Sequence, residues 1–220
     1  MASTFCLWAS RMSYFHLEKH PHKLVLAETT IFRYCMIRGN LLSLHPENVT
    51  KSKEVSMKST IVIYGSSTGS CQSIAETIAS KLGVEAVDVA NIDDATVASH
   101  ENLLLGTSTW GAGEMQDEWY DGVNTLKSAG LAGKTVALFG CGDSESYPDT
   151  FCGGMKELYD AAVEAGATVL PGVSTDGYTY DDSEAIDGDK FLGLALDEVN
   201  EDDKTEERID AWLEAIKPAL

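Results

Sequence analysis

The sequence predicts an α/β fold of three layers, in which helices cover both faces of a five-stranded parallel sheet. From residue 60 onward, short β-branched apolar segments alternate with segments whose apolar residues recur at helical spacing. Such alternation is typical of strand–helix–strand units with parallel strands. Glycine- and serine-rich loops follow several of the strands, at the carboxyl ends where folds of this class bind ligands.

The strands are predicted from short apolar runs that suit burial on both faces. The first four lie at residues 60–64, 84–89, 102–106 and 135–139, and a fifth begins at 168–170. Residues 177–189 are polar and rich in turn formers, whereas residues 191–196 are apolar again. The fifth strand is therefore predicted to be interrupted by an insertion of about 20 residues.

Helices are predicted between the strands, around residues 74–82, 119–126 and 155–162, where apolar residues are spaced three or four apart. A last helix is predicted to begin near Thr205, whose hydroxyl group can cap it. Lys217 suits the negative end of that helix, and Trp212 belongs to its buried face. The acidic residues 201–203 are predicted to form a solvated loop before it.

The composition changes near Met57 and predicts two parts. Residues 1–56 contain seven Lys or Arg and four Asp or Glu, whereas residues 57–220 contain nine and thirty-one. Residues 57–220 are therefore predicted to form one compact domain. For residues 1–56 three interpretations stay open: an upstream extension without function, an organelle-targeting segment, or an accessory segment. Depending on that choice, the expected location is the cytoplasm or an organelle.

The net charge near −22 in residues 57–220 argues against nucleic acid or anionic membranes as partners, because phosphates would be repelled. It favours a partner with a basic docking face. No apolar run is long enough to span a bilayer. Three sparse cysteines, Cys71, Cys141 and Cys152, suit a reducing compartment.

The loop after the first strand has the composition of a phosphate site. Residues 65–71 read Gly-Ser-Ser-Thr-Gly-Ser-Cys and run directly into a helix, so backbone N–H groups, hydroxyl groups and a helix dipole converge. No lysine lies between Gly65 and Ser80, which excludes the usual nucleoside-triphosphate loop. A dinucleotide glycine motif is also absent. A monophosphate held by neutral donors is the prediction that remains.

Two aromatic residues follow two further strands. Trp110 lies among small residues after the third strand, and Tyr147 lies in the loop after the fourth. Because the residues beside each aromatic offer it little to pack against, we expect both rings to face a ligand. Two rings beside one phosphate site can hold a flat ring system by stacking.

These residues resemble the flavodoxin family, long-chain type, over about residues 57–220. The motifs that match are Ser66–Cys71 as the phosphate loop, Thr109-Trp110 as the second flavin loop, and Gly142-Asp143 with Tyr147 as the third. The segments 176–180 and 189–198 are similar to the long-chain insertion and tail. Cys71 departs from the family, which has threonine there, and weaker phosphate binding is expected because a thiol is a poorer donor.

The resemblance implies a flavodoxin-like fold that binds FMN without a covalent bond. The FMN-binding residues that it implies are Ser66, Ser67, Thr68, Gly69, Ser70, Cys71, Thr107, Ser108, Thr109, Trp110, Gly111, Ala112, Gly113, Cys141, Gly142, Asp143, Tyr147, Phe151 and Cys152. No catalytic residue and no metal ligand are predicted. Acidic residues near the flavin by loop membership are Glu114, Asp117, Glu118, Asp143 and Asp149.

The function that the resemblance implies is a low-potential one-electron carrier that works between the semiquinone and hydroquinone forms of FMN. Its expected partners are redox proteins with basic docking faces, such as ferredoxin/flavodoxin-NADP reductases, and a monomer is expected. An alternative in another class is a flavodoxin-like NAD(P)H:quinone reductase, which would need room for nicotinamide over the flavin. A third is a binding or signalling module with the same fold and no flavin.

Overall fold

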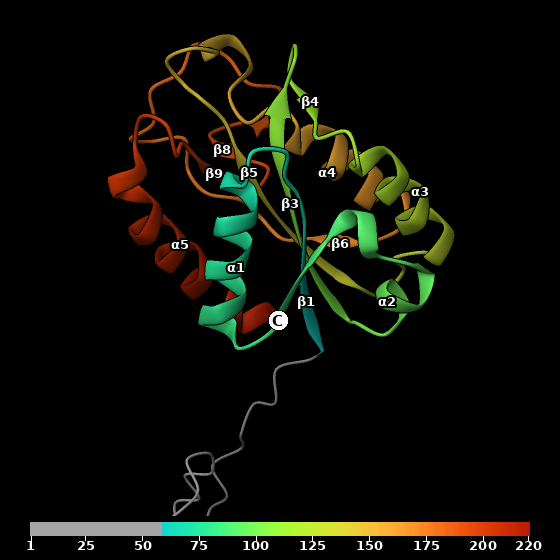
Figure 1. Cartoon of the computed structure of the whole chain (residues 1–220). Helices are drawn as coiled ribbons and strands as arrows, with labels where there is room; N and C mark the ends of the chain where they lie inside the picture. Colours follow the sequence, from blue (N-terminus) through green and yellow to red (C-terminus); the bar gives the residue numbers. More distant parts are fainter. Residues whose placement is uncertain (1–58) are drawn as a thin grey trace, which may run out of the picture. The chain divides into compact units, whose positions relative to one another are not determined.

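The computed structural model describes residues 59–220, and Figure 1 shows their arrangement. A parallel sheet of strand order β2–β1–β3–β5–β6 forms the middle layer. Its strands, with the two that join it off this path, are β1 (Thr60–Gly65), β2 (Glu85–Asp88), β3 (Asn102–Trp110), β4 (Glu114–Met115), β5 (Thr135–Cys141), β6 (Thr168–Val169) and β9 (Leu194–Leu196). The predicted α/β fold is confirmed. The expectations for residues 1–56 lie outside the described residues.

The fifth position of the sheet is filled by two separate strands. Strand β6 pairs with one end of β5, at Thr135 and Val136, and β9 pairs with the other end, from Phe139 to Cys141. Both pairings are parallel. The chain between them forms the small hairpin of β7 (Ile186–Asp187) and β8 (Lys190–Phe191). The prediction of a fifth strand interrupted by an insertion is therefore confirmed.

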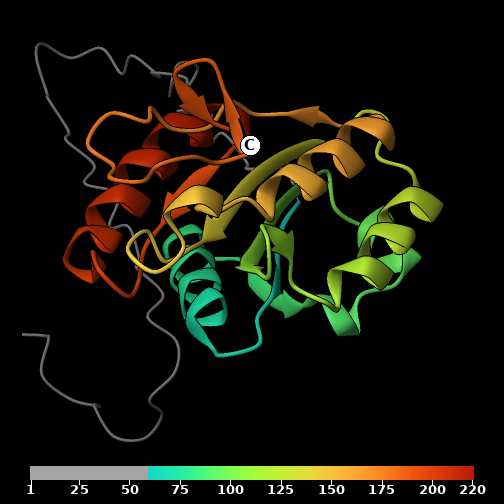
Figure 2. The same cartoon turned by 90° about the horizontal axis from the view of Figure 1, so that it is seen from above.

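Helices cover both faces of the sheet, as Figure 2 shows from above. Helices α1 (Ser70–Leu82) and α5 (Asp202–Ile216) lie on one face, and α2 (Asp94–Ala98), α3 (Trp119–Ala129) and α4 (Met155–Glu164) lie on the other. Successive residues of each strand point to opposite faces of the sheet. Val62 and Leu104 belong to the apolar cluster under α1 and α5, whereas Ile61 and Leu103 belong to the cluster on the other face. Two apolar cores result, one on each side of the sheet.

Strands β3 and β5 run further than the sequence predicts. The ladder between them continues through Thr107, paired with Gly140, and Ser108, paired with Cys141. Strand β3 then pairs antiparallel with β4 at Thr109 and Trp110. Small and hydroxyl-bearing residues, which locally favour a loop, are held as strand here by pairing partners distant in the sequence. Thr109 and Trp110, predicted as the second flavin loop, are therefore the last two residues of β3.

The start of the last helix was predicted too late. Helix α5 begins at Asp202 and no side chain caps it, so Thr205 lies inside the helix and its hydroxyl group donates to the carboxylate of Glu198. Asp202 and Asp203 occupy the first turn, where acidic side chains favour the positive end of the helix dipole. Glu201, predicted in a solvated loop, is half-buried and forms ion pairs with Lys204 and Arg208.

Candidate functional site

A cavity of about 410 Å³ lies where the loops after β1, β3, β5 and β9 meet. This is the carboxyl edge of the sheet, at which the sequence places its ligand site. Eleven of the predicted FMN-binding residues line the cavity, namely Thr68, Ser70, Ser108, Thr109, Trp110, Gly111, Cys141, Gly142, Asp143, Tyr147 and Phe151. Its size falls in the range of small-molecule sites.

The phosphate loop leaves the N-terminal end of α1 open. Gly69 occupies the N-cap position with φ +96°, a left-handed conformation that glycine adopts without strain, and no side chain caps the helix. Within the loop, the N–H group of Gly69 donates to the hydroxyl group of Ser66 at 3.2 Å. The remaining N–H groups of the first turn are the donors that a helix offers to an anion. Thr68 and Ser70 add hydroxyl groups at the cavity wall.

A turn held by a carboxylate carries Trp110. The N–H group of Gly113 donates to the carbonyl oxygen of Trp110 at 2.9 Å, and Glu114 accepts from the N–H group of Ala112 at 2.5 Å. Gly111 has φ +54°, and a Cβ atom there would lie 2.2 Å from Oε2 of Glu114. The indole N–H of Trp110 donates to Ser108 Oγ at 2.8 Å. The tryptophan ring is thereby fixed at the cavity while 43% of the residue remains exposed.

The loop after β5 is tied to the start of α5 through a buried carboxylate. Asp197 is fully buried and accepts hydrogen bonds from the backbone and the hydroxyl group of Ser144, at 2.9 and 2.6 Å. It also accepts from the N–H groups of Val199 and Asn200 and from the Asn200 amide. The same amide donates to Asp143 Oδ1 at 3.0 Å. This network positions the loop that ends in Tyr147.

Two carboxyl groups of this network have lowered pKa values. Burial alone raises the pKa of Asp197, but the donors of Asn200 and Ser144 outweigh it and hold the pKa below its ordinary value. For Asp143, burial is likewise outweighed by the donors of Ser146 and Asn200, so its pKa is also lowered. Both groups are therefore charged near neutral pH, and Asp143 brings its charge to the cavity wall.

The two aromatic residues lie at the rim of the cavity. Tyr147 is 62% exposed and Trp110 is partly exposed, so neither ring has its expected stacking partner in the protein itself. Both rings are therefore free to contact a ligand, and the expectation that they do so stays a prediction. Phe151 differs: it is 1% exposed, and its ring packs against Tyr180 at 5.7 Å and Phe191 at 6.0 Å between centroids. Its ring is thus part of the core under the insertion.

Eight of the predicted residues do not line the cavity: Ser66, Ser67, Gly69, Cys71, Thr107, Ala112, Gly113 and Cys152. Several support its loops instead. The hydroxyl group of Thr107 accepts from the N–H group of Gln116 at 3.0 Å, and Ser67 accepts from the Gln116 amide at 3.4 Å. The thiol groups of Cys71 and Cys152 are fully buried. The expected weakening of phosphate binding by Cys71 stays a prediction.

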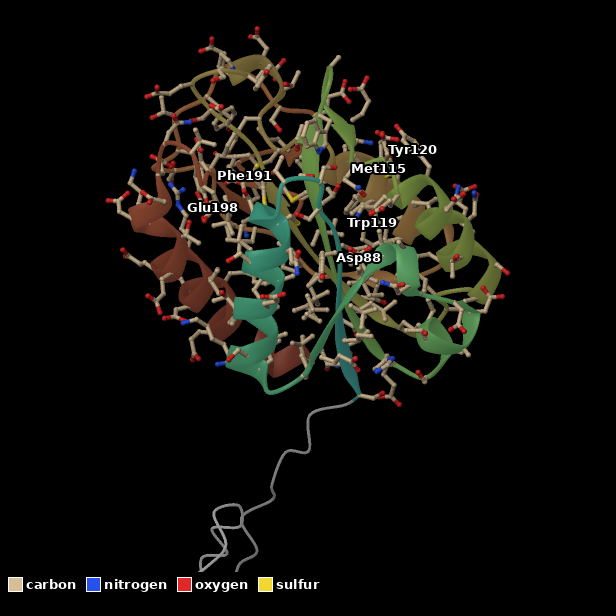
Figure 3. The ribbon with its side chains drawn as sticks, in the orientation of Figure 1. Asp88, Met115, Trp119, Tyr120, Phe191 and Glu198 are labelled. Atoms are coloured by element: carbon tan, nitrogen blue, oxygen red, sulfur yellow. The ribbon has the colours of Figure 1, made fainter. Side chains whose placement is uncertain are left out.

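Three cavity residues were missed from the sequence: Thr150, Glu198 and Val199. Glu198 and Val199 follow β9, the second half of the fifth strand, so the rule that ligands meet the carboxyl ends of strands could have found them. Figure 3 shows Glu198 near the end of the fold where α5 begins. Trp119 lies deeper, between sheet and α3, and donates to the carbonyl oxygen of Gly106 at 2.8 Å.

Comparison with known proteins gives one consistent result. The family model described as Flavodoxin matches residues 62–212. Flavodoxin 1 of Azotobacter vinelandii is 39% identical over 163 residues, covering 71% of this chain and 94% of the relative. A flavodoxin of Helicobacter pylori is 40% identical over 157 residues, covering 71% of this chain and 94% of the relative.

A solved structure agrees with these relatives. The crystal structure of Fusobacterium nucleatum flavodoxin bound to flavin mononucleotide has a TM-score of 0.70 and 34% identity. The match covers 74% of this chain and 99% of that one. The fold, the loops at the carboxyl edge and the relatives agree, and the chain belongs to the flavodoxin family.

Proposed function

We propose that this chain is an electron carrier that holds FMN in the cavity at the carboxyl edge of its sheet. One observation carries the proposal: an open helix N-terminus and two partly exposed aromatic rings meet around the same 410 Å³ space. A phosphate group needs the first feature, and a flat heteroaromatic ring system needs the second. A flavin mononucleotide contains both groups in one molecule.

The residues fit this cofactor in a definite orientation. The N–H groups at the start of α1, with Thr68 and Ser70, would hold the phosphate group. Trp110 and Tyr147 would cover the two faces of the isoalloxazine ring. Bound FMN supplies the redox chemistry, because a flavin can accept and release electrons one at a time. The protein binds and orients the flavin, and its charges set the potential.

A carrier is favoured over an NAD(P)H:quinone reductase by the position of the aromatic residues. A hydride donor must stack on one face of the flavin, and Trp110 and Tyr147 line the cavity where those faces would lie. The relatives named above are flavodoxins as well. A module without flavin would leave the two exposed aromatic residues without a role.

The partners that we propose are redox proteins with basic docking faces, of the ferredoxin/flavodoxin-NADP reductase type. Residues 57–220 carry nine basic and thirty-one acidic residues, and exposed acidic residues such as Glu114, Asp117 and Asp149 lie in β4 and in the segments that follow β4 and β5. Such a surface speeds association with a basic partner and repels nucleic acid. Among residues 59–220, no helix could cross a membrane. We place a monomer in the cytoplasm, where free thiols persist.

The proposal is tested with the purified full-length chain, freed of flavin and titrated with FMN. We expect one FMN per chain, with a shift of the flavin absorption bands, followed by one-electron steps during stepwise reduction. Steady NADPH oxidation should require an added reductase. A protein whose absorption spectrum stays unchanged with excess FMN would refute flavin binding. NADPH oxidation by the chain alone would favour the reductase.

A further inference from the structure

The segment between β4 and α3 contains a buried glutamine that the flavin contacts described above do not use. Gln116 follows Met115, the last residue of β4, which Figure 3 labels. Gln116 is only 4% exposed, and it is not among the residues that line the cavity. A buried amide needs hydrogen-bond partners, because burial removes the water that would otherwise satisfy it. The partners of this amide therefore indicate what it holds in place.

The amide of Gln116 is satisfied at both of its polar atoms. Its Nε2 donates to Glu118 Oε2 at 3.2 Å and to Ser67 Oγ at 3.4 Å, and its Oε1 accepts from the N–H group of Glu118 at 3.0 Å. Glu118 fixes the orientation of the amide, because its carboxylate needs a donor and its N–H group needs an acceptor. The amide nitrogen therefore faces Ser67, in the predicted phosphate loop.

Gln116 also contacts the start of this loop. Gly65 is the last residue of β1, and a Cβ atom there would lie 2.6 Å from Gln116 Oε1. The lack of a side chain at Gly65 thus lets the amide approach the backbone. The N–H group of Gln116 donates to Thr107 Oγ1 at 3.0 Å, and Thr107 is the β3 partner of Gly65 in the sheet. Gln116 therefore lies at the junction of β1, β3 and β4.

This junction connects the phosphate loop to the turn that carries Trp110. Strand β4 pairs with β3 at Thr109 and Trp110, and Gln116 continues directly from β4. Within residues 59–220, the hydrogen bond from Gln116 is the one that ties a side chain of residues 66–68 to another part of the fold. The position of the loop relative to the turn thus depends on this buried amide.

We propose that Gln116 is a positioning residue for the phosphate group of FMN. It holds the loop at Ser67, and the neighbouring hydroxyl groups of Thr68 and Ser70 line the cavity beside the open N–H groups of α1. Without the hydrogen bond, the loop would have to be ordered when the anion binds, and that ordering costs affinity. This role of Gln116 rests on the proposed function, because it requires the phosphate group at the start of α1.

The test compares Gln116→Met with the parent in titrations of the flavin-free full-length chain with FMN and with riboflavin. Methionine is similar in length and has no hydrogen-bond donor. We expect the FMN dissociation constant to rise about tenfold, the effect of one net hydrogen bond, and the riboflavin constant to change by less than about twofold. A merely structural role would weaken both ligands equally, because they share the ring system. Equal rises for both ligands, or no rise for FMN, would overturn the assignment.

Asn102→Leu is the matched control. Asn102 is also a buried amide that donates to a hydroxyl group, Thr60 Oγ1 at 3.0 Å, but it lies at the amino ends of β1 and β3, away from the cavity. Its loss should lower the free energy of unfolding and leave the ratio of the two dissociation constants unchanged. A ratio that falls equally in this control would mean that the ratio reports stability rather than position, and would overturn the role of Gln116.

Ser67→Ala tests the acceptor of the hydrogen bond. Ser67 is exposed, so this variant leaves no cavity in the core, and it decides the question even where Gln116→Met does not fold. We expect the FMN constant to rise by a similar factor and the riboflavin constant to stay nearly unchanged. Adding Gln116→Met to Ser67→Ala should have little further effect, because both changes remove the same hydrogen bond.

The outcomes of these titrations separate the role of Gln116 from the proposed function. An unchanged FMN constant in Ser67→Ala, or fully additive effects in the double variant, would overturn the positioning role. A parent chain that binds neither flavin, or binds both equally, contradicts the proposed function instead, because FMN would then not place its phosphate group at α1.

Discussion

The loop that would hold phosphate and the loops that would hold the ring differ in how their backbone N–H groups are satisfied. The phosphate loop has few internal hydrogen bonds, and α1 begins without a side-chain cap. The turn at Trp110 is held by Glu114, and the loop that carries Tyr147 is held by Asp197. One region leaves donors unsatisfied, and the other satisfies them with carboxylates of the protein.

The difference shows which part of the affinity each region can supply. Free N–H groups at a helix N-terminus gain their hydrogen bonds only when an anion binds. The aromatic loops are already ordered, so the ring does not have to order them on binding, which lowers the entropic cost. We therefore expect the phosphate loop to dominate affinity and the aromatic loops to dominate orientation and potential.

The largest effect is expected from a change of ligand, which tests the phosphate loop separately from the loops that carry Trp110 and Tyr147. Riboflavin has the ring system of FMN but lacks its phosphate group. Loss of two charge-assisted hydrogen bonds, at roughly 1.5–3 kcal/mol each, predicts a dissociation constant raised by about a thousandfold. Fluorescence titration of the flavin-free protein with both ligands measures the ratio. Equal affinity would mean that the open end of α1 does not hold phosphate.

The next largest effect is expected from a variant that lacks the buried carboxylate of Asp197, which holds the loop that carries Tyr147. Asp197→Asn replaces an acceptor of five donor groups, from Ser144, Val199 and Asn200, with a side chain that cannot accept all of them. We expect a loss of about 3 kcal/mol in the free energy of unfolding. Urea denaturation of the full-length chain measures it, with Asp187→Asn, an exposed acid, as the matched control. Equal stability of the two variants would argue against this role of Asp197.

The same network predicts how stability depends on pH. The pKa of Asp197 is lowered in the folded state, so its stabilising contribution is fully present above the unfolded value of about 3.9. It is lost as the pH falls below that value and through the lowered folded pKa. Unfolding measured between neutral pH and about pH 2 should show this loss, and Asp197→Asn should show less of it. Parallel curves for the two proteins would contradict the assignment.

The same contrast explains what could be predicted from the sequence. The loop that runs into the uncapped start of α1 was predictable because its signal is local: glycine and hydroxyl residues directly before a helix. The Asp197 network joins residues 53 positions apart, so no local pattern reveals it. The extension of β3 to Trp110 was missed for a similar reason, since its partners on β5 and β4 decide it. Glu198 and Val199 became site residues only because β9 returns to the sheet beside β5.

A smaller effect is expected from strain in the turn that carries Trp110. Gly111→Val places a β-branched side chain at φ +54°, against Oε2 of Glu114. A cost of about 1–3 kcal/mol is expected, and the peptide loses its freedom to reorient as the flavin gains an electron. A redox titration should show a lower yield of the one-electron-reduced form. Ala112→Val, which lacks the positive φ angle, is the control and should change the yield less. Equal yields in both variants would show that strain at Gly111 is unimportant.

The smallest effect concerns charge at the ordered edge of the cavity. Glu198 lines the cavity, and its negative charge opposes the charge that an added electron brings. At a separation of about 10 Å and an effective dielectric near 40, one unit charge contributes roughly 0.8 kcal/mol, or about 35 mV. Glu198→Gln should raise the lower of the two reduction potentials by that amount, and less at high salt because ions screen the charge. The hydrogen bond from Thr205 can persist to the amide oxygen, so the variant isolates charge from structure. Asp187→Asn is the control, because its exposed side chain is not among the cavity residues, and it should leave the potential nearly unchanged. A shift of equal size in that variant would show that net charge, rather than the position of the charge, sets the potential.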